Sequence, residues 1–213
     1  MIITVTGKPY SGKSVTIDYM EKEYGFDVVH VGELYRQYGM QKNMDVLELN
    51  KSGDYNADYY VDNAQIEIAK QRKDDEIIFD GRMSWHLLPE SFKVFLDVCQ
   101  DVQAKRLLGS KRASENTNVS FQQAKILANE RWNVENERYQ KLYNCDNLNL
   151  SNYDYVLDTS NTVIEDNAQS ILDHYRGYKQ DALNKTLDEA DKIYEAICEQ
   201  IDKSKPKQAK RDF

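Results

Sequence analysis

The segment from Gly7 to Ser14 constrains the fold of this 213-residue chain more than any other feature. It reads Gly-Lys-Pro-Tyr-Ser-Gly-Lys-Ser and has the spacing G-x-x-x-x-G-K-[ST]. A β-branched apolar run at residues 1–6 precedes it, and a helical pattern at 14–24 follows it. Strand, glycine loop and helix in this order predict a phosphate cradle, because backbone N–H groups and the positive end of the helix dipole surround the bound anion.

The same loop assigns roles to its side chains. Lys13 would neutralise the β- and γ-oxygens of a nucleotide, and the Ser14 hydroxyl would reach the Mg²⁺ that bridges them. Tyr10 stands where many such loops have a small residue; it could cover the phosphates or point to solvent, and we expect solvent. The loop residues expected to bind ATP are Gly7, Lys8, Pro9, Tyr10, Ser11, Gly12, Lys13 and Ser14.

The rest of the chain alternates between strand and helix patterns. Further strands are expected at 27–31, 76–80, 92–98 and 153–158, and helices at 58–72, 101–109 and about 120–142, with a loop opening a helix at 32–38. This alternation predicts an α/β fold with a parallel sheet. The strand 76–80 ends in Asp80, whose carboxylate could hold Mg²⁺ through water or could cap the turn before Gly81.

Composition narrows the function. The chain has 28 Lys and Arg against 36 Asp and Glu, a net charge of −8, which disfavours binding to a nucleic-acid polymer. The N-terminus lacks signal-peptide features, and no run approaches the roughly 18 apolar residues of a membrane span. The three cysteines and three histidines form no zinc-site spacing. We therefore expect a soluble, cytoplasmic protein that binds no membrane.

The chain changes character after Gly177. Apolar residues recur there at alternating spacings of four and three, which is a heptad seam on one helix. The seam could lie on the parent domain or form a coiled coil in a dimer, so the protein could be a monomer or a dimer. The seam residues are Leu183, Leu187, Ala190, Tyr194, Ile197 and Ile201.

The glycine loop alone does not decide between GTPases, motor or transport ATPases and kinases. Asn50-Lys-Ser-Gly-Asp54 resembles the guanine-reading N-K-x-D, but its Asp comes one residue late and no apolar strand precedes it. A kinase with a phosphorylated acceptor needs several arginines, because the transfer brings two polyanions together. The candidates are Arg36, Arg82, Arg106, Arg131 and Arg138.

Arg131, Glu135 and Arg138 are spaced four and three apart, so two guanidinium groups and a carboxylate share one face of the predicted helix. That face could grip a phosphate and a ribose. It could also be a solvated ladder of salt bridges.

Several segments, in order along residues 1–176, resemble nucleoside monophosphate kinases, specifically the cytidylate kinase family in its short archaeal form. They are Ile3–Ser14, Val31–Arg36, Asp58–Asp62 with Gln65, Phe79–Arg82, Arg106, Glu130–Arg131 through Arg138–Tyr139, and Ser151–Ser160. The resemblance implies a three-layer P-loop fold over 1–176, with a small acceptor-binding insertion at about 37–70 and a helical lid at about 108–139. Residues 177–213 would be a helical extension.

The resemblance also implies site roles. Arginines matching Arg36, Arg82, Arg131 and Arg138 hold the acceptor phosphate, Glu135 lies near the ribose, Asp58 binds the acceptor, and Arg106 faces ATP. The catalytic residues would be Lys13, Arg131 and Arg138, and the metal ligands Ser14 and Asp80. Glu33, Met83 and Tyr10 depart from the family pattern.

The leading hypothesis is transfer of the ATP γ-phosphate to CMP or dCMP with Mg²⁺. The alternatives are a kinase of another small acceptor, such as UMP, AMP or a non-nucleotide, and a catalytically silent ATP-binding scaffold.

Overall fold

The computed structural model describes residues 1–44, 56–110 and 118–204. The chain divides into two compact units, Met1–His174 and Tyr175–Phe213. Three segments fall outside the described residues: 45–55, which contains Asn50–Asp54, 111–117, and the chain beyond 204. The expected insertion at 37–70 and the expected lid at 108–139 each contain one of these segments.

The first unit is built on five parallel strands. They are β1 (Ile2–Gly7), β2 (Asp27–His30), β3 (Ile77–Asp80), β4 (Phe92–Asp97) and β5 (Tyr155–Asp158). Their order in the sheet is β2-β3-β1-β4-β5, with every pair parallel. The predicted α/β class and parallel sheet are confirmed. In β1 every residue from Ile3 to Gly7 is buried, as expected for a central parallel strand covered on both faces.

The predicted helices are confirmed within one or two residues at each end. They are α1 (Lys13–Tyr24), α4 (Asn56–Gln71), α6 (Gln100–Leu108) and α7 (Phe121–Tyr143). The loop expected at 32–38 was wrong, because α2 (Val31–Gln41) begins directly after β2. Gly32 suggested a loop, but it lies in the first turn of α2, where Glu33 favours the helix dipole.

Shorter elements were not predicted. They are α5 (Ser84–Leu87) and the 3₁₀ turn η1 (Leu150–Asn152). The last helix, α8, runs without a break from Ile164 to Ser204, so it begins well before Gly177. The predicted seam lies on this helix, although the side chains of Ile197 and Ile201 fall outside the described part. Within the described residues no helix is both long and apolar enough to cross a bilayer.

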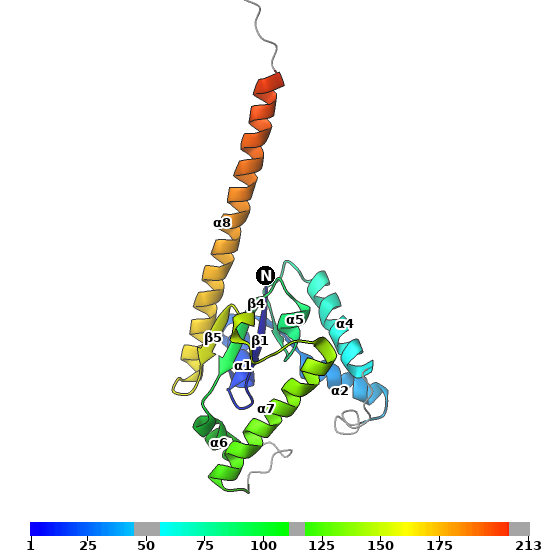
Figure 1. Cartoon of the computed structure of the whole chain (residues 1–213), viewed down its shortest axis with the longest axis vertical. Coiled ribbons are helices and arrows are strands. Elements are labelled where there is room, and N and C mark those ends of the chain that lie inside the picture. The colour runs from blue at the N-terminus through cyan, green and yellow to red at the C-terminus, as the bar shows by residue number, and fades with distance from the viewer. Residues whose placement is uncertain (45–55, 111–117, 205–213) are drawn as a thin grey trace, which may run out of the picture. The chain divides into compact units, whose positions relative to one another are not determined.

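The helices that surround the site gather at one end of the sheet. In Figure 1, β1 runs from the N label toward α6 and α7, which pack side by side near its carboxyl end. α2 and α4 pack together on another side of the same end. β1 has β3 on one side and β4 on the other, and in α/β sheets ligands bind beyond the carboxyl ends of the strands at such a point.

Two clusters of buried side chains fix α7. One joins Trp132 of α7 to Trp85, Phe95 and Tyr153. The other joins Ala124 and Ala128 of α7 to Ala104 and Leu107 of α6. Because small residues on α7 face α6, the two helices can approach closely. The buried side of α7 is thereby set, and its charged side is aimed at the end of the sheet.

Candidate active site

The loop after β1 has the backbone that phosphate binding requires. A Cβ on Gly7 would lie 2.5 Å from the carbonyl oxygen of Leu96 in β4, so only glycine fits there. Gly12 has a φ of 85° in the left-handed region and caps α1. The first N–H groups of α1, from Lys13 onward, therefore open toward the loop, as an anion site at a helix N-terminus needs.

Lys13 is paired with a carboxylate in this structure. Its Nζ forms an ion pair with Asp80 Oδ1, and His30 Nδ1 lies 3.3 Å from Asp80 Oδ2. Asp80 thus lies at the carboxyl end of β3 beside the phosphate loop. In the described residues no hydrogen bond from Asp80 to the turn at Gly81 is found, so the turn-capping alternative gains no support.

A cavity of about 380 Å³ lies over the phosphate loop. Besides loop residues Lys8 to Val15 it is lined by Arg82, Arg106, Ser110 and Arg131. Eight of the nine residues expected to bind ATP line it, Arg106 included. Gly7 is the exception: it lies in β1, paired with Leu96 of β4.

Tyr10 does not point to solvent, so that expectation was wrong. Its ring packs against the α6–α7 cluster, and the Arg131 guanidinium lies over the ring, 5.8 Å from its centroid. The backbone of Tyr10 has a positive φ of 62°, which costs a non-glycine residue energy. Aromatic packing and the Arg131 contact offset that strain and join the phosphate loop to α7.

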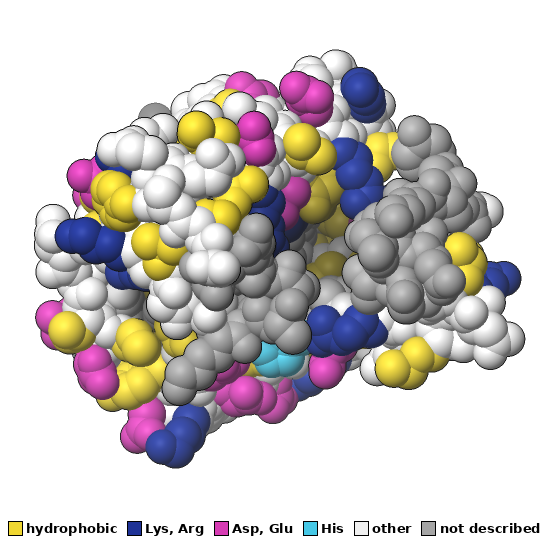
Figure 2. All heavy atoms as spheres, turned by 90° about the horizontal axis from the view of Figure 1, so that it is seen from below, with side chains coloured by type: hydrophobic (Ala, Val, Ile, Leu, Met, Phe, Trp, Pro, Cys, Tyr) yellow, Lys and Arg dark blue, Asp and Glu magenta, His cyan; other side chains and the backbone are white. Residues whose placement is uncertain are grey.

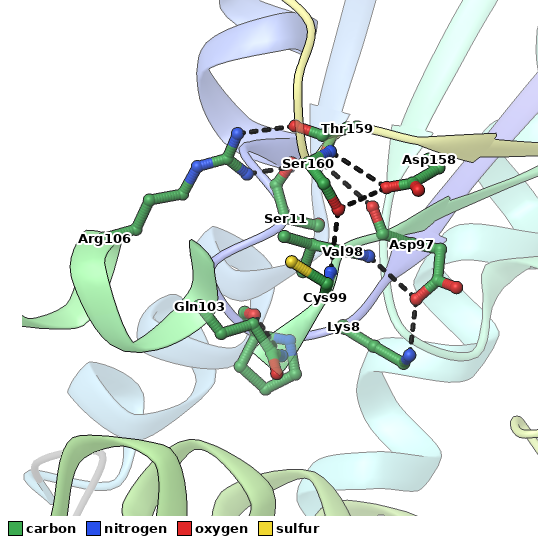
Figure 3. A network of polar contacts seen from close by, with 11 residues as sticks. Lys8, Ser11, Asp97, Val98, Cys99, Gln103, Arg106, Asp158, Thr159 and Ser160 are labelled. Atoms are coloured by element: carbon green, nitrogen blue, oxygen red, sulfur yellow. Dashed lines mark hydrogen bonds and ion pairs between the residues drawn. The ribbon is translucent and has the colours of Figure 1, made fainter. Parts of the chain in front are cut away.

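A network of polar contacts fixes the outer side of the loop (Figure 3). Arg106 of α6 donates to the carbonyl oxygen of Thr159, just after β5, at 2.7 Å. It also donates to the carbonyl oxygen of Tyr10 at 3.0 Å. The Thr159 hydroxyl donates to the carbonyl oxygen of Ser11 at 2.8 Å. Gln103 donates to the carbonyl oxygen of Pro9 at 2.9 Å. Arg106 thus joins the Tyr10 carbonyl of the phosphate loop to Thr159, and it also lines the cavity.

A second cavity, of about 810 Å³, adjoins the first. Lys13, Ser14 and Arg82 line both cavities, so these three residues mark the place where their contents would meet. Figure 2 looks onto this end of the molecule and shows a hollow in which basic and acidic side chains lie together. Among the predicted acceptor residues, the larger cavity is lined by Arg36, Asp58, Arg82, Glu135 and Arg138.

Arg131 is the exception among the predicted acceptor residues. It lines the smaller cavity and is absent from the lining of the larger one. Its Nε donates to Glu135 Oε1 at 3.2 Å, and Glu135 Oε2 lies 3.1 Å from Arg82 Nε. Glu135 therefore bridges Arg131, which lines the smaller cavity, and Arg82, which lines both cavities.

The charged face of α7 is not a solvated ladder. Arg138 donates to both carboxylate oxygens of Asp58 on α4, at 2.6 and 2.5 Å. Arg82 also donates to the carbonyl oxygen of Gly7, and it stacks 5.7 Å from the Trp132 ring centroid. Besides the Arg131–Glu135 pair within the helix, the charged face of α7 thus has partners on other elements, around the two cavities.

Asp62, one turn after Asp58 on α4, also lines the larger cavity. Its Oδ2 accepts a hydrogen bond from the Tyr143 hydroxyl at 2.8 Å. Burial, reinforced by the nearby Asp58, raises the pKa of Asp62 to about 6, against the lowering effect of Tyr143 and Arg138. Burial likewise raises the pKa of Tyr139 to about 12, so this tyrosine stays neutral.

Comparison with known proteins identifies the family. The model of the cytidylate kinase-like family matches residues 2–161. The chain belongs to the cytidylate kinase-like family. It is 32% identical over 161 residues to a cytidylate kinase of Methanothrix thermoacetophila, which covers 75% of this chain and 88% of that protein. It is also 31% identical over 172 residues to a cytidylate kinase of Methanocaldococcus jannaschii, an alignment that covers 78% of this chain and 92% of that protein. The resemblance inferred from the sequence is confirmed.

The fold agrees with solved kinases. A shikimate kinase from Bacteroides thetaiotaomicron superposes with a TM-score of 0.56 at 16% identity, covering 81% of this chain and 97% of that one. At that identity the likeness shows the P-loop kinase fold alone. As a member of the cytidylate kinase-like family with this fold, the chain is an ATP-dependent nucleoside monophosphate kinase.

Sequence reasoning missed some residues that shape the site of this cytidylate kinase-like protein. Thr159 and Gln103 hold the phosphate loop through backbone carbonyls, which no motif records. Thr159 could have been suspected, since it directly follows a predicted strand at the ligand end of the sheet. Asp62 belongs to the segment Asp58–Asp62, which carried part of the resemblance. Its hydrogen bond with Tyr143 could not have been predicted, because it joins α4 to α7.

Proposed function

We propose that this chain transfers the γ-phosphoryl group of ATP to CMP or dCMP, giving ADP and CDP or dCDP. The observation that carries the proposal is that two cavities share Lys13, Ser14 and Arg82. ATP would lie on the phosphate loop in the smaller cavity and the monophosphate in the larger, so that both phosphates reach the shared residues. The names of the archaeal relatives support the choice of cytidine.

The transfer needs no nucleophilic side chain. An oxygen of the acceptor phosphate forms a bond to the γ-phosphorus, while the bond from that phosphorus to the β–γ bridging oxygen breaks and ADP leaves. The protein contributes positioning and charge. Lys13 and Arg82 would neutralise the transferring group from the shared wall, Arg131 from the ATP side, and Arg36 and Arg138 would hold the acceptor.

The residues beside Lys13 fit a magnesium ion held together with the nucleotide. Ser14 offers a hydroxyl and Asp80 a carboxylate, and Mg²⁺ in kinases takes one or two such ligands plus phosphate oxygens. Within the described residues no group of three or more His, Cys, Asp or Glu forms a cage of its own. Bound there, the ion would neutralise charge on the β- and γ-phosphates.

We also propose that α6 and α7 act as the lid, covering ATP from Arg106 and Arg131, and that α2 and α4 form the acceptor-binding part. Closure of a lid over both substrates would exclude water and so suppress ATP hydrolysis. The helical extension after Gly177 would make the protein either a monomer or a dimer through this helix, and the mass of the protein in solution separates the two.

An acceptor panel tests the proposal. Full-length protein with ATP and Mg²⁺ is assayed with CMP, dCMP, UMP and AMP, and kcat/KM is expected to be highest for CMP or dCMP. Equal or faster turnover of UMP or AMP would refute the cytidine assignment. ATP binding without transfer to any acceptor would favour the scaffold alternative.

A matched pair of lysine variants tests the site itself. Lys13→Ala is expected to lower kcat by about 100-fold or more for every acceptor, since it removes charge stabilisation at the transferring group. Lys105→Ala, which removes an exposed lysine from α6, should leave kcat unchanged. Circular dichroism checks that both variants are folded; equal kcat values for the two would contradict the assigned role of Lys13.

A further inference from the structure

The larger cavity is lined by six carboxylates, and five of them are accounted for. Two are exposed and three are held by cations. The exposed pair are Asp18 and Glu33, and the cation-bound set are Asp58 (with Arg138), Asp80 (with Lys13) and Glu135 (with Arg82 and Arg131). Asp62 is the sixth: it is partly buried and makes no ion pair with the described residues, although the charge of Arg138 acts on it.

The contacts of Asp62 leave one of its oxygens available. In the described chain the Tyr143 hydroxyl is the one hydrogen-bond donor found for Asp62, and it bonds to Oδ2. Oδ1 lacks a donor among the described residues. An acceptor oxygen in a cavity wall that receives no hydrogen bond from the protein is complementary to an N–H group of a ligand in the cavity.

The neighbouring polar side chain is already engaged. Gln65 is buried one turn further along α4, where its Oε1 accepts from the Ser84 hydroxyl at 2.6 Å and its Nε2 reaches the Val61 carbonyl oxygen at 3.4 Å. Met83, also in the lining, offers no strong donor or acceptor. Asp62 is therefore the acceptor on this wall that a ligand can use.

We propose that the Asp62 carboxylate accepts a hydrogen bond from the exocyclic amino group of the acceptor base, so that the cavity takes cytosine and rejects uracil. This inference rests on the proposed function. Asp62 lines the larger cavity and not the smaller one. With its phosphate near Lys13 and Arg82, where the cavities meet, the acceptor would therefore extend its base toward Asp62 on α4. Uracil would instead turn a carbonyl oxygen toward Asp62, and two acceptors would face each other.

Asp62→Asn tests the inference, because an amide keeps the shape of the side chain and can donate to a uracil carbonyl. We expect the ratio of kcat/KM for CMP over UMP to fall by about 30-fold or more, as for loss of a buried hydrogen bond to a charged group. The KM for ATP should stay within about two-fold, since Asp62 lies outside the ATP cavity. Glu67→Gln, the same acid-to-amide change at an exposed position of α4, is the matched control and should leave the ratio unchanged.

A pH series provides a second readout. Asp58 on the same helix and Arg138 and Tyr143 on α7 also face Asp62. Both acceptor phosphates titrate alike, so their effect cancels in the CMP-to-UMP ratio. That ratio should rise as pH increases through about 6 in the unmodified protein, as Asp62 becomes a carboxylate, and should be flat in Asp62→Asn.

The outcomes separate this inference from the function on which it rests. If the unmodified protein phosphorylates CMP but Asp62→Asn slows CMP and UMP equally, the base-reading role is overturned and the proposed function stands. If the unmodified protein phosphorylates no cytidine nucleotide, the proposed function fails and the inference fails with it. A ratio that collapses in Asp62→Asn alone supports both.

Discussion

Asp62 should also make the protein less stable at neutral pH than a neutral side chain would. Its pKa is raised from 3.8 to about 6, chiefly by burial. The folded protein therefore holds this proton more tightly than the unfolded chain, and stability falls as pH rises from about 4 to about 6. Two pKa units correspond to about 3 kcal/mol, but the side chain is partly exposed, so solvent screening leaves about 1–2 kcal/mol.

Asp62→Asn removes this penalty, since the amide oxygen still accepts the Tyr143 hydroxyl and carries no charge. We expect the free energy of unfolding at pH 7.5 to rise by about 1–2 kcal/mol, with the melting temperature higher by about 2–8 °C for a chain of this size. At pH 4.5, where Asp62 is mostly protonated in the folded protein, the gain should be clearly smaller. Urea unfolding followed by circular dichroism at both pH values measures the difference.

Glu67→Gln again serves as the control, because it changes the formal charge on the same helix at an exposed position, where one ion pair contributes little. The reasoning is refuted if Asp62→Asn is no more stable than the unmodified protein at pH 7.5. It is equally refuted if the gain is the same at pH 4.5, since the penalty must follow the charge of Asp62.

Three further variants probe the contacts around the two cavities. Arg138→Ala should raise the acceptor KM by about ten-fold or more with little change in the KM for ATP, as steady-state kinetics in both substrates can check. The change removes a cation from the larger cavity and takes the ion-pair partner of the Asp58 carboxylate away. Tyr10→Ala should raise the KM for ATP several-fold, because alanine keeps the backbone strain and loses the ring under Arg131, whereas Tyr10→Phe should stay within about two-fold. Arg106→Ala should raise the KM for ATP by about ten-fold and lower the melting temperature, since it removes hydrogen bonds that hold the loop carbonyls.

The sequence predicted the parts of the fold that depend on local pattern. Strand lengths, helix periodicity and the glycine loop follow from nearby residues, so all five strands and the main helices were found. Where prediction failed, a local signal was overruled by packing. Gly32 suggested a loop but lies in a helix, and Tyr10 suggested solvent but packs on α6 and α7.

The site was predicted as a set of residues but not as an arrangement. The spacing of the charged residues on α7 predicted a role for Arg131 in the site, yet which cavity Arg131 lines depends on how α7 packs. That packing is set by Trp132 and by the alanines facing α6. The pairing of Arg138 with Asp58 likewise joins positions 80 residues apart. No spacing rule in the sequence encodes such contacts.

These pairings explain how an acidic protein can hold so many cations close together before its substrates bind. The cations around the two cavities would repel one another if they stood alone, but each of them faces a carboxylate. The pairs are Lys13 with Asp80, Arg82 and Arg131 with Glu135, and Arg138 with Asp58. Two polyanionic substrates would take over these cations in turn, which would leave the Asp80 carboxylate available as the proposed ligand of Mg²⁺. Binding then exchanges one anionic partner for another at nearly constant local charge, so the arginines and Lys13 need little rearrangement to meet the transferring phosphoryl group. Asp62 stands outside this exchange because it has no cation to give up, which is why we assign it to the uncharged base.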